Sequence, residues 1–395
     1  MTLGRSATAA ALTVLLVAAV SVGPAAAAVD GDTRSYAGTH VSFDASGSAV
    51  TDYAVDGTTV LASIETESQS SYEQRTGIGL GLDLSTVTDF QAASISLSAS
   101  TSTTATVQAD SGATLRAHDN SHGSLVVASG GEAQLVKAEV GSGASTEAES
   151  DSRVVVTAAD GTTGTFLVVG EGSVDVNGEG DVVANVESDG RLVFRTYGEG
   201  ERDEDTQTTE RMIANGTATG AVYVMSESGA VVSDTVNYTS DSTITAQQSA
   251  ESQVSITVDR ASSEGKVVVT QVGEAAVGST ENLQVAVDGE AAAEASTYGE
   301  LVAATEGGSN SKYMVRQSAS GQARVLVGVN HFSERTITMS GDDGSSGNDE
   351  SDGDDGSNGD DGSNADDGGT STSMPGFGIP AAVVSLAGAA WLRRR

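Results

Sequence analysis

Short runs that alternate apolar and polar side chains, rich in valine and threonine, recur along the middle of this chain. They lie at 104–109, 124–128, 153–158, 253–258, 266–272, 284–287, 324–329 and 335–339. Successive side chains of a β-strand point to opposite faces, so this alternation with β-branched residues is typical of half-buried strands. No stretch has a strong helical period, which argues against strand–helix–strand units. The pattern predicts an all-β body.

Asp-Gly and Asn-Gly pairs separate these runs, at 56–57, 160–161, 177–178, 189–190 and 288–289. Such pairs accept the positive φ angles that tight hairpin turns need. Their spacing predicts antiparallel sheets packed as a sandwich. An apolar triplet that runs into Gly-Glu recurs at unequal spacing, at 125–132, 167–171 and 267–274. Because the spacing is unequal, we interpret this repeat as a recurrent hairpin composition rather than a solenoid period. The small core residues keep a β-helix or solenoid as the alternative architecture.

A charged segment at 198–211 has no large apolar side chain and interrupts the body. Its composition is that of a linker or a long loop. We therefore expect two β-rich domains, at 29–199 and 212–340, joined by an acidic linker at 200–211.

The first 28 residues have the pattern of a secretory signal peptide. Arg5 precedes an apolar run at 9–20, and Ala26 and Ala28 occupy the positions of an Ala-x-Ala cleavage site. The apolar run is too short for a stable anchor. We expect export by the general secretory route and cleavage near Ala28, with an uncleaved N-terminal anchor as the alternative.

Residues 341–373 contain 11 acidic and no basic residues, set among Gly, Ser and Asn. Such a segment cannot bury enough apolar surface to offset the entropy of ordering, and its like charges extend it. We predict a disordered stalk here. Calcium binding is the alternative, because Asp and Asn oxygens ligate Ca²⁺, but the spacing of an EF-hand loop is not met. Weakly bound Ca²⁺ or Mg²⁺ is the only cofactor we retain.

The chain ends in an apolar segment followed by a cluster of arginines. The residues that bound it are Pro375, Gly376, Phe377, Arg393, Arg394 and Arg395. A hydrophobic helix of this length lies at the short limit for crossing a bilayer, and terminal arginines stay on the cytoplasmic side. We expect a membrane segment at 374–395.

Pro375-Gly376-Phe377, one apolar helix and a terminal arginine cluster resemble the archaeal PGF-CTERM sorting signal. The resemblance covers only the C-terminal segment at 374–395. It implies that a membrane archaeosortase cuts near the tripeptide and that the new C-terminus is joined to a lipid, as for other removable apolar tails. The alternative is an ordinary C-terminal transmembrane helix. Both alternatives place the body outside the cell at the membrane.

The chain carries 55 acidic against 19 basic residues, a formal net charge of -36. A polyanion repels phosphate, which argues against nucleic-acid binding. The acid excess, the scarcity of lysine and the small apolar side chains resemble the surfaces of haloarchaeal proteins. Molar salt shortens the Debye length to about 3 Å, so carboxylates barely repel one another there. We predict that the body loses structure below roughly molar salt.

Patterns that carry catalysis or metal binding are weak in this chain. It has no Cys, and therefore no disulfide, no thiol catalysis and no Cys-based zinc site. His118 and His122 are four apart, as in helical zinc sites, but the Asp-Asn-Ser between them favours a polar turn. Carboxylates are too abundant to single out a catalytic pair, and no Gly-x-Ser-x-Gly motif is present. We predict no catalytic residue, no metal site and no enzymatic activity.

Two Asn-x-Thr sequons begin at Asn215 and Asn237. In an exported protein both are candidate N-glycan acceptors.

These features predict an exported acidic cell-surface protein of structural or interaction type, anchored by a membrane segment or a lipid. We expect it in the cell envelope or S-layer of a halophilic archaeon. The expected partners are the membrane, a sorting enzyme at the C-terminus and other surface-layer proteins. The alternatives are an extracellular solute- or polysaccharide-binding module, and a surface hydrolase or lyase on a β scaffold.

Overall fold

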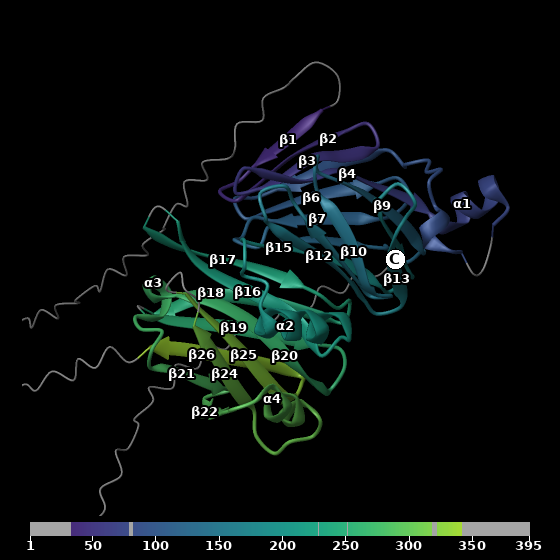
Figure 1. Cartoon of the computed structure of the whole chain (residues 1–395). Helices are drawn as coiled ribbons and strands as arrows, with labels where there is room; N and C mark the ends of the chain where they lie inside the picture. The colour runs from purple at the N-terminus through teal and green to yellow at the C-terminus, as the bar shows by residue number, and fades with distance from the viewer. Residues whose placement is uncertain (1–32, 79–81, 228, 251, 318–321, 342–395) are drawn as a thin grey trace, which may run out of the picture. The chain divides into compact units, whose positions relative to one another are not determined.

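The computed structural model of this chain describes residues 33–78, 82–227, 229–250, 252–317 and 322–341 (Figure 1). All of them fall in one compact unit, formed by residues up to 345. The predicted signal peptide, the C-terminal segment and all of the predicted stalk except Gly341 lie outside the described residues. Within the described parts, no helix has the length and apolar character needed to cross a membrane.

The described strands form four sheets. Sheet 1 has the strand order β1 (Arg34–Ala37), β2 (Val41–Ser46), β3 (Ala49–Val55), β4 (Thr58–Ser68), β9 (Gln134–Val140), β14 (Val182–Val186) and β13 (Gly172–Val176). Sheet 2 has the order β10 (Ser145–Ser150), β11 (Arg153–Thr157), β12 (Thr163–Val169), β15 (Arg191–Tyr197), β8 (Leu125–Ala128), β7 (Thr114–His118), β6 (Thr104–Ala109) and β5 (Ile95–Ser100).

The C-terminal half supplies the other two sheets. Sheet 3 has the order β17 (Ala230–Asn237), β16 (Ala218–Glu227), β20 (Glu264–Gly273), β25 (Gln322–His331), β24 (Lys312–Gln317) and β23 (Ala293–Glu294). Sheet 4 has the order β18 (Ser242–Ala250), β19 (Gln253–Arg260), β26 (Glu334–Gly341), β21 (Leu283–Val287) and β22 (Glu290–Ala291). Among the described strands, only β16–β20 and β23–β24 pair in parallel.

Short helices lie between the strands. They are α1 (Gln69–Thr76), the 3-10 turn η1 (Leu84–Thr86), α2 (Glu204–Ala214), α3 (Glu274–Val277) and α4 (Tyr298–Thr305). α2 contacts β12 and β16, and α4 contacts β20, β24 and β25.

Two apolar cores confirm the predicted all-β, sandwich-type fold. The first joins the inner faces of sheets 1 and 2, with side chains such as Phe43 and Ile64 meeting Leu115 and Phe166. The second joins sheets 3 and 4 through residues such as Val268 and Ile256. Burying one such side chain stabilises the fold by about 1.5–3 kcal/mol. Antiparallel hairpins, rather than parallel coils, carry the architecture, so the solenoid alternative does not apply.

Strand alternation places these core residues. In β19, Val254, Ile256 and Val258 are fully buried, while the residues between them are partly exposed. The predicted turn at 56–57 joins β3 to β4, and Asp56 and Gly57 have φ angles of 48° and 83°. Both angles are positive, as a two-residue hairpin turn of type I′ requires.

The acidic linker expected at 200–211 is mostly helical, so its interpretation as a loop was wrong. Asp203 caps α2 by accepting a hydrogen bond from the backbone N–H of Thr206. Met212 and Ile213 lie just beyond the predicted linker, in the last turn of the helix, and both side chains are buried in an apolar cluster. The composition misled because the helix also buries a charged side chain, Glu210, which pairs with Arg202 of the same segment and accepts a hydrogen bond from Thr165 of β12.

Sheets 1 and 2 are built from β1–β15, and sheets 3 and 4 from β16–β26. The predicted boundary therefore falls where sheet membership changes. A third apolar cluster nevertheless joins the halves, with Val126 and Val193 from sheet 2, Tyr223 and Val267 from sheet 3, and Ile213 from α2. The division into two domains stays a prediction.

Candidate functional site

Buried polar side chains concentrate where the outer face of sheet 2 meets sheet 3 and α2. We call this group the polar seam, and it consists of His118, Asn120, His122, Thr165, Arg195, Glu210 and Asp234. Tyr223 of the third apolar cluster contacts two of these side chains, Arg195 and His122. Because buried polar groups are costly unless they are paired, the partners in the seam determine what it can do.

The predicted turn after β7 forms one part of the seam. His118 Nδ1 lies 2.9 Å from Asp234 Oδ1, and Asn120 Nδ2 donates to Asp234 Oδ2 at 2.8 Å. Both carboxylate oxygens of Asp234 are therefore satisfied from β7 and its turn. The polar turn that the sequence predicted is confirmed, but it is buried rather than solvated.

Asp119, in the same turn, holds a neighbouring segment of backbone. Its carboxylate accepts hydrogen bonds from the backbone N–H groups of Thr39, His40 and Val41, at 2.6, 2.7 and 2.7 Å. A Cβ atom on Gly38 would lie 2.3 Å from the Asp119 carboxyl group, so only glycine fits there. Asp119 thus fixes the loop between β1 and β2.

His122 is held as a neutral ring. Burial, followed by the charge of Arg195, lowers its pKa to about 3. Its Nδ1 lies 2.8 Å from the carbonyl oxygen of Thr196, which can only accept, so Nδ1 carries the proton. Nε2 lies 3.1 Å from the side-chain amide of Gln271. Because Nε2 of this neutral ring carries no proton, the amide must donate its N–H to Nε2.

Arg195 is a cation in the interior, 2% exposed. Its Nη2 donates to Tyr223 Oη at 3.2 Å, and its guanidinium lies 5.6 Å from the centre of the Tyr197 ring. Arg195 Nε and Tyr197 Oη are buried and have no partner among the described residues. Such atoms are normally satisfied by ordered water, so we expect buried water in this part of the seam.

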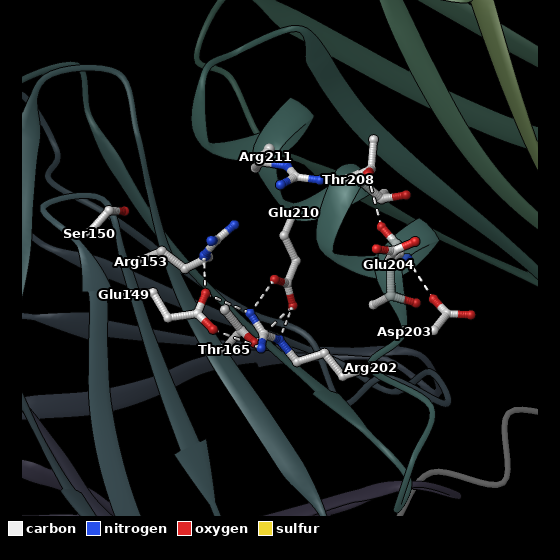
Figure 2. A network of polar contacts seen from close by, with 12 residues as sticks. Glu149, Ser150, Arg153, Thr165, Arg202, Asp203, Glu204, Thr208, Glu210 and Arg211 are labelled. Atoms are coloured by element: carbon white, nitrogen blue, oxygen red, sulfur yellow. Dashed lines mark hydrogen bonds and ion pairs between the residues drawn. The ribbon is translucent and has the colours of Figure 1, made fainter. Parts of the chain in front are cut away.

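An ion-pair network joins α2 to the edge of sheet 2. Figure 2 shows the Arg202 guanidinium between Glu149 of β10 and Glu210 of α2. Nη1 and Nη2 donate to the two Glu149 oxygens, each at 2.9 Å, and Nε and Nη2 donate to those of Glu210 at 3.0 and 2.8 Å. Thr165 Oγ1 donates to Glu210 at 2.9 Å. Glu210 is fully buried, so Arg202 compensates a charge that has left water.

The outer end of this network is reinforced by a second arginine. Arg153 Nε lies 2.6 Å from Glu149 Oε2 (Figure 2). Burial alone would raise the pKa of Glu149, but the hydrogen bonds and charge of Arg202, together with Arg153, lower it below its ordinary value. Glu149 therefore stays ionised around neutral pH.

The two sequon asparagines lie in different settings. Asn215 is exposed directly after α2, and its Oδ1 accepts a hydrogen bond from the backbone N–H of Thr217 at 3.0 Å. It borders a cavity of about 670 Å³. Asn237 ends β17, is half-buried, and its Oδ1 is buried without a partner among the described residues. The predicted cleavage-site and sorting-signal residues lie outside the described residues. They are Ala26, Ala28, Pro375, Gly376, Phe377 and Arg393–Arg395.

Sequence reasoning did not single out Asp234, Glu210 or Arg202. With 55 carboxylates in the chain, no pattern distinguishes the few that are buried. Arg195 offers a usable signal for a buried charge. Leu192 and Phe194 are two positions apart and both lie in the first core, so Arg195 must lie on the opposite face of β15. In the structure this face is covered by sheet 3, and Arg195 is buried there against Tyr223.

The seam joins parts of the chain that are far apart in sequence. The contacts from β7 and its turn to β17 and β20 span 114 to 149 positions. In the parts of the chain that the structure describes, no three His, Asp or Glu side chains converge in a way that could hold a metal ion. The geometry supports a fixed connection between the two pairs of sheets.

Comparisons with known proteins add no family. No protein-family model and no curated protein matches the chain. One solved structure, titled "Active YidC insertase crystal structure with the first transmembrane domain resolved", aligns at 11% identity with a TM-score of 0.28. The alignment covers 48% of this chain and 45% of that one. A similarity at this level carries no argument about fold or function.

Proposed function

We propose that the protein is exported and held at the outer face of the plasma membrane of a halophilic archaeon. There its β body is a structural or interaction component of the cell envelope or S-layer. The observation that carries this proposal is the C-terminal arrangement of Pro375-Gly376-Phe377, an apolar segment and Arg393–Arg395. No catalytic activity forms part of the proposal.

The acidic segment at 341–373 suits the role of a spacer. It begins where β26 ends the described body, and it leads to the sorting tripeptide. A flexible chain of this length has a root-mean-square span of roughly 30 Å, and charge repulsion lengthens it. The body would then stand clear of the membrane surface and within reach of neighbouring envelope proteins.

The distribution of charge within the body also supports a protein that works in brine. Arg202 is enclosed by two carboxylates, and Arg260, nearly buried, pairs with Asp241 at 2.5 Å. Salt screens buried pairs much less than exposed ones, so such contacts persist at molar ionic strength. The exposed acidic excess is tolerated under the same conditions, because its repulsion is screened.

The test is mass spectrometry of the mature termini, combined with fractionation of the cells. The mature protein should lack residues 1–28, lack Arg395, carry a C-terminal lipid and partition with the envelope. A variant with Pro375, Gly376 and Phe377 all changed to Ala should retain Arg395. A control with Ser371, Thr372 and Ser373 changed to Ala should be processed normally.

An envelope-bound protein that keeps Arg395 would instead identify an ordinary transmembrane helix at the C-terminus. A full-length chain recovered from the cytosol, with its first 28 residues intact, would overturn the proposal. The structural role is tested separately, by deleting the gene and scoring cell shape and release of surface-layer protein.

A further inference from the structure

One small cavity in the body is lined by cationic side chains, in a chain that is otherwise strongly acidic. It has a volume of about 200 Å³ and lies against the outer face of sheet 2. Its lining consists of Thr114, Arg116, His118, Val126, Ala128, Arg191, Asn237 and Ser242. No Asp or Glu is among these residues, although acidic residues outnumber basic ones by 55 to 19.

Strand register brings the two arginines to this cavity. Arg116 of β7 pairs opposite Val126 of β8, and Arg191 of β15 pairs opposite Ala128 of the same strand. The arginines thus flank β8 on one face, two strands apart and offset by two residues, which places their backbones about 12 Å apart. Ala128 has too short a side chain to fill the space between them. Long arginine side chains on either side can therefore converge on one ligand.

Arg116 is exposed, and it is the one arginine of the described residues whose side chain makes no hydrogen bond or ion pair to another described group. Arginines elsewhere in the body bind carboxylates, as Arg75, Arg153, Arg202, Arg260, Arg316 and Arg335 do. Arg191 donates only a long hydrogen bond, 3.4 Å, to the carbonyl oxygen of Asn237, and its Nε is buried without a partner. Burial, followed by the charge of Arg116, lowers the pKa of Arg191. Two adjacent cations, one exposed and one partly buried, therefore have no carboxylate partner among the described residues.

We propose that Arg116 and Arg191 bind a tetrahedral oxyanion, a sulfate or phosphate group, in this cavity. Two guanidinium groups carry two positive charges at any physiological pH, which a dianion balances and a single carboxylate does not. The planar donor forks of arginine match the oxygens of such a group. The cavity is smaller than the roughly 300–1,000 Å³ of ordinary ligand pockets, so it takes one small group.

Asn237 adds a third polar group to the wall of the site. Its Oδ1 is buried without a partner, and turning the amide would present Nδ2 as a further donor to the anion. The dianion has two sources with the same chemistry: the free ion, or a phosphate monoester at the end of a surface sugar.

The test is equilibrium dialysis of the full-length protein with radiolabelled sulfate, at constant high KCl. The wild-type protein should bind about one sulfate per chain. Arg116→Gln and Arg191→Gln should each weaken binding by at least about tenfold, the range expected for losing a charge-assisted hydrogen-bonding partner. Arg211→Gln is the matched control, because Arg211 is an exposed arginine that contacts only Thr208. It should bind as the wild type does.

Competition with glucose 6-phosphate at about pH 8, where its phosphate group is a dianion, decides the source. If it displaces the label as well as free sulfate does, the site accepts a sugar-borne group; if it does not, the site takes the free ion.

A second measurement separates binding from a structural role. Because the two arginines repel each other, Arg116→Gln should be at least as stable as the wild type in KCl without sulfate or phosphate. A loss of stability under those conditions would assign Arg116 a structural role and overturn the proposal. Unaltered sulfate binding by both variants, or no binding by the wild type, would overturn it as well.

Discussion

Asp234 Oδ1 lies 2.9 Å from His118 Nδ1, and this contact joins β17 of sheet 3 to β7 of sheet 2 across 116 positions of the chain. Both side chains are almost completely buried, at 1% and 2% exposure. A buried pair of this kind is costly to break, because the remaining partner stays out of water without compensation. The contact therefore makes the stability of each half depend on the other.

Replacing Asp234 by Ala should destabilise the protein by about 3 kcal/mol, because it leaves the buried side chains of His118 and Asn120 without their hydrogen-bond partner. Asp259→Ala is the control, since Asp259 is an exposed strand residue. Chemical denaturation in concentrated KCl measures both variants. Equal effects of the two substitutions would show that the seam contributes no more than a surface position.

Replacing Glu210 by Gln should cost about 2–4 kcal/mol, and this cost should persist at high salt. The Arg202 guanidinium would lose one of its two carboxylate partners, and this partner is the buried one. Asp89→Asn is the comparison: Asp89 pairs with Arg75 but is 85% exposed, so its effect should stay below about 1 kcal/mol and shrink with salt. Unfolding free energies at two KCl concentrations distinguish the two cases. A Glu210→Gln effect that disappears on adding salt would contradict the buried network.

His122 should make the fold sensitive to acid. The folded protein keeps His122 neutral down to about pH 3, whereas its ordinary pKa is 6.5. Between these values the unfolded state binds more protons, so stability present above about pH 6.5 is lost as the pH falls toward 3. The limiting slope is about 1.4 kcal/mol per pH unit.

His122→Gln is the variant that tests this slope. It keeps a polar side chain beside Arg195, Arg324 and the tyrosines that face the ring, but it cannot titrate. Its stability, measured by denaturation across this pH range, should depend less steeply on pH than that of the wild type. Parallel curves for the two proteins would show that His122 titrates normally in the folded state.

The body should require salt, as its composition predicts. Circular dichroism should show sheet structure in about 3 M KCl and progressive loss below roughly molar salt, because unscreened carboxylates repel one another. A matched series in which sucrose replaces KCl controls for osmotic effects. A spectrum that does not change down to dilute buffer would disprove the salt requirement.

Asn215 should carry an N-glycan more readily than Asn237. Asn215 is exposed in the turn after α2, whereas Asn237 ends β17 with its amide oxygen buried. Mass spectrometry of peptides from the native protein measures the occupancy of each site. A glycan on Asn237 at equal occupancy would mean that modification precedes folding of this strand.

Much of the strand layout was predictable from the sequence. All eight alternating runs lie in strands to within one residue, and the turn at 56–57 has the backbone angles expected of Asp-Gly. The period of two residues fixes which side chains share a face, so β19 could be assigned its buried positions without any tertiary information. The segment at 200–211 was misinterpreted because its helix is stabilised by contacts outside the segment.

The sequence by itself determined that this chain forms β-strands with small apolar cores, and it gives the reasons to expect export and anchoring. Both are local properties, readable from the spacing of residues within a few turns of chain. Only the tertiary structure decided which charges are buried. His118 meets Asp234, and Arg202 meets Glu149, because the fold brings together parts of the chain that are far apart in sequence. Arg116 and Arg191 face a cavity without a carboxylate for the same reason: the partner of a charge depends on which distant strands share a surface, and composition does not encode that.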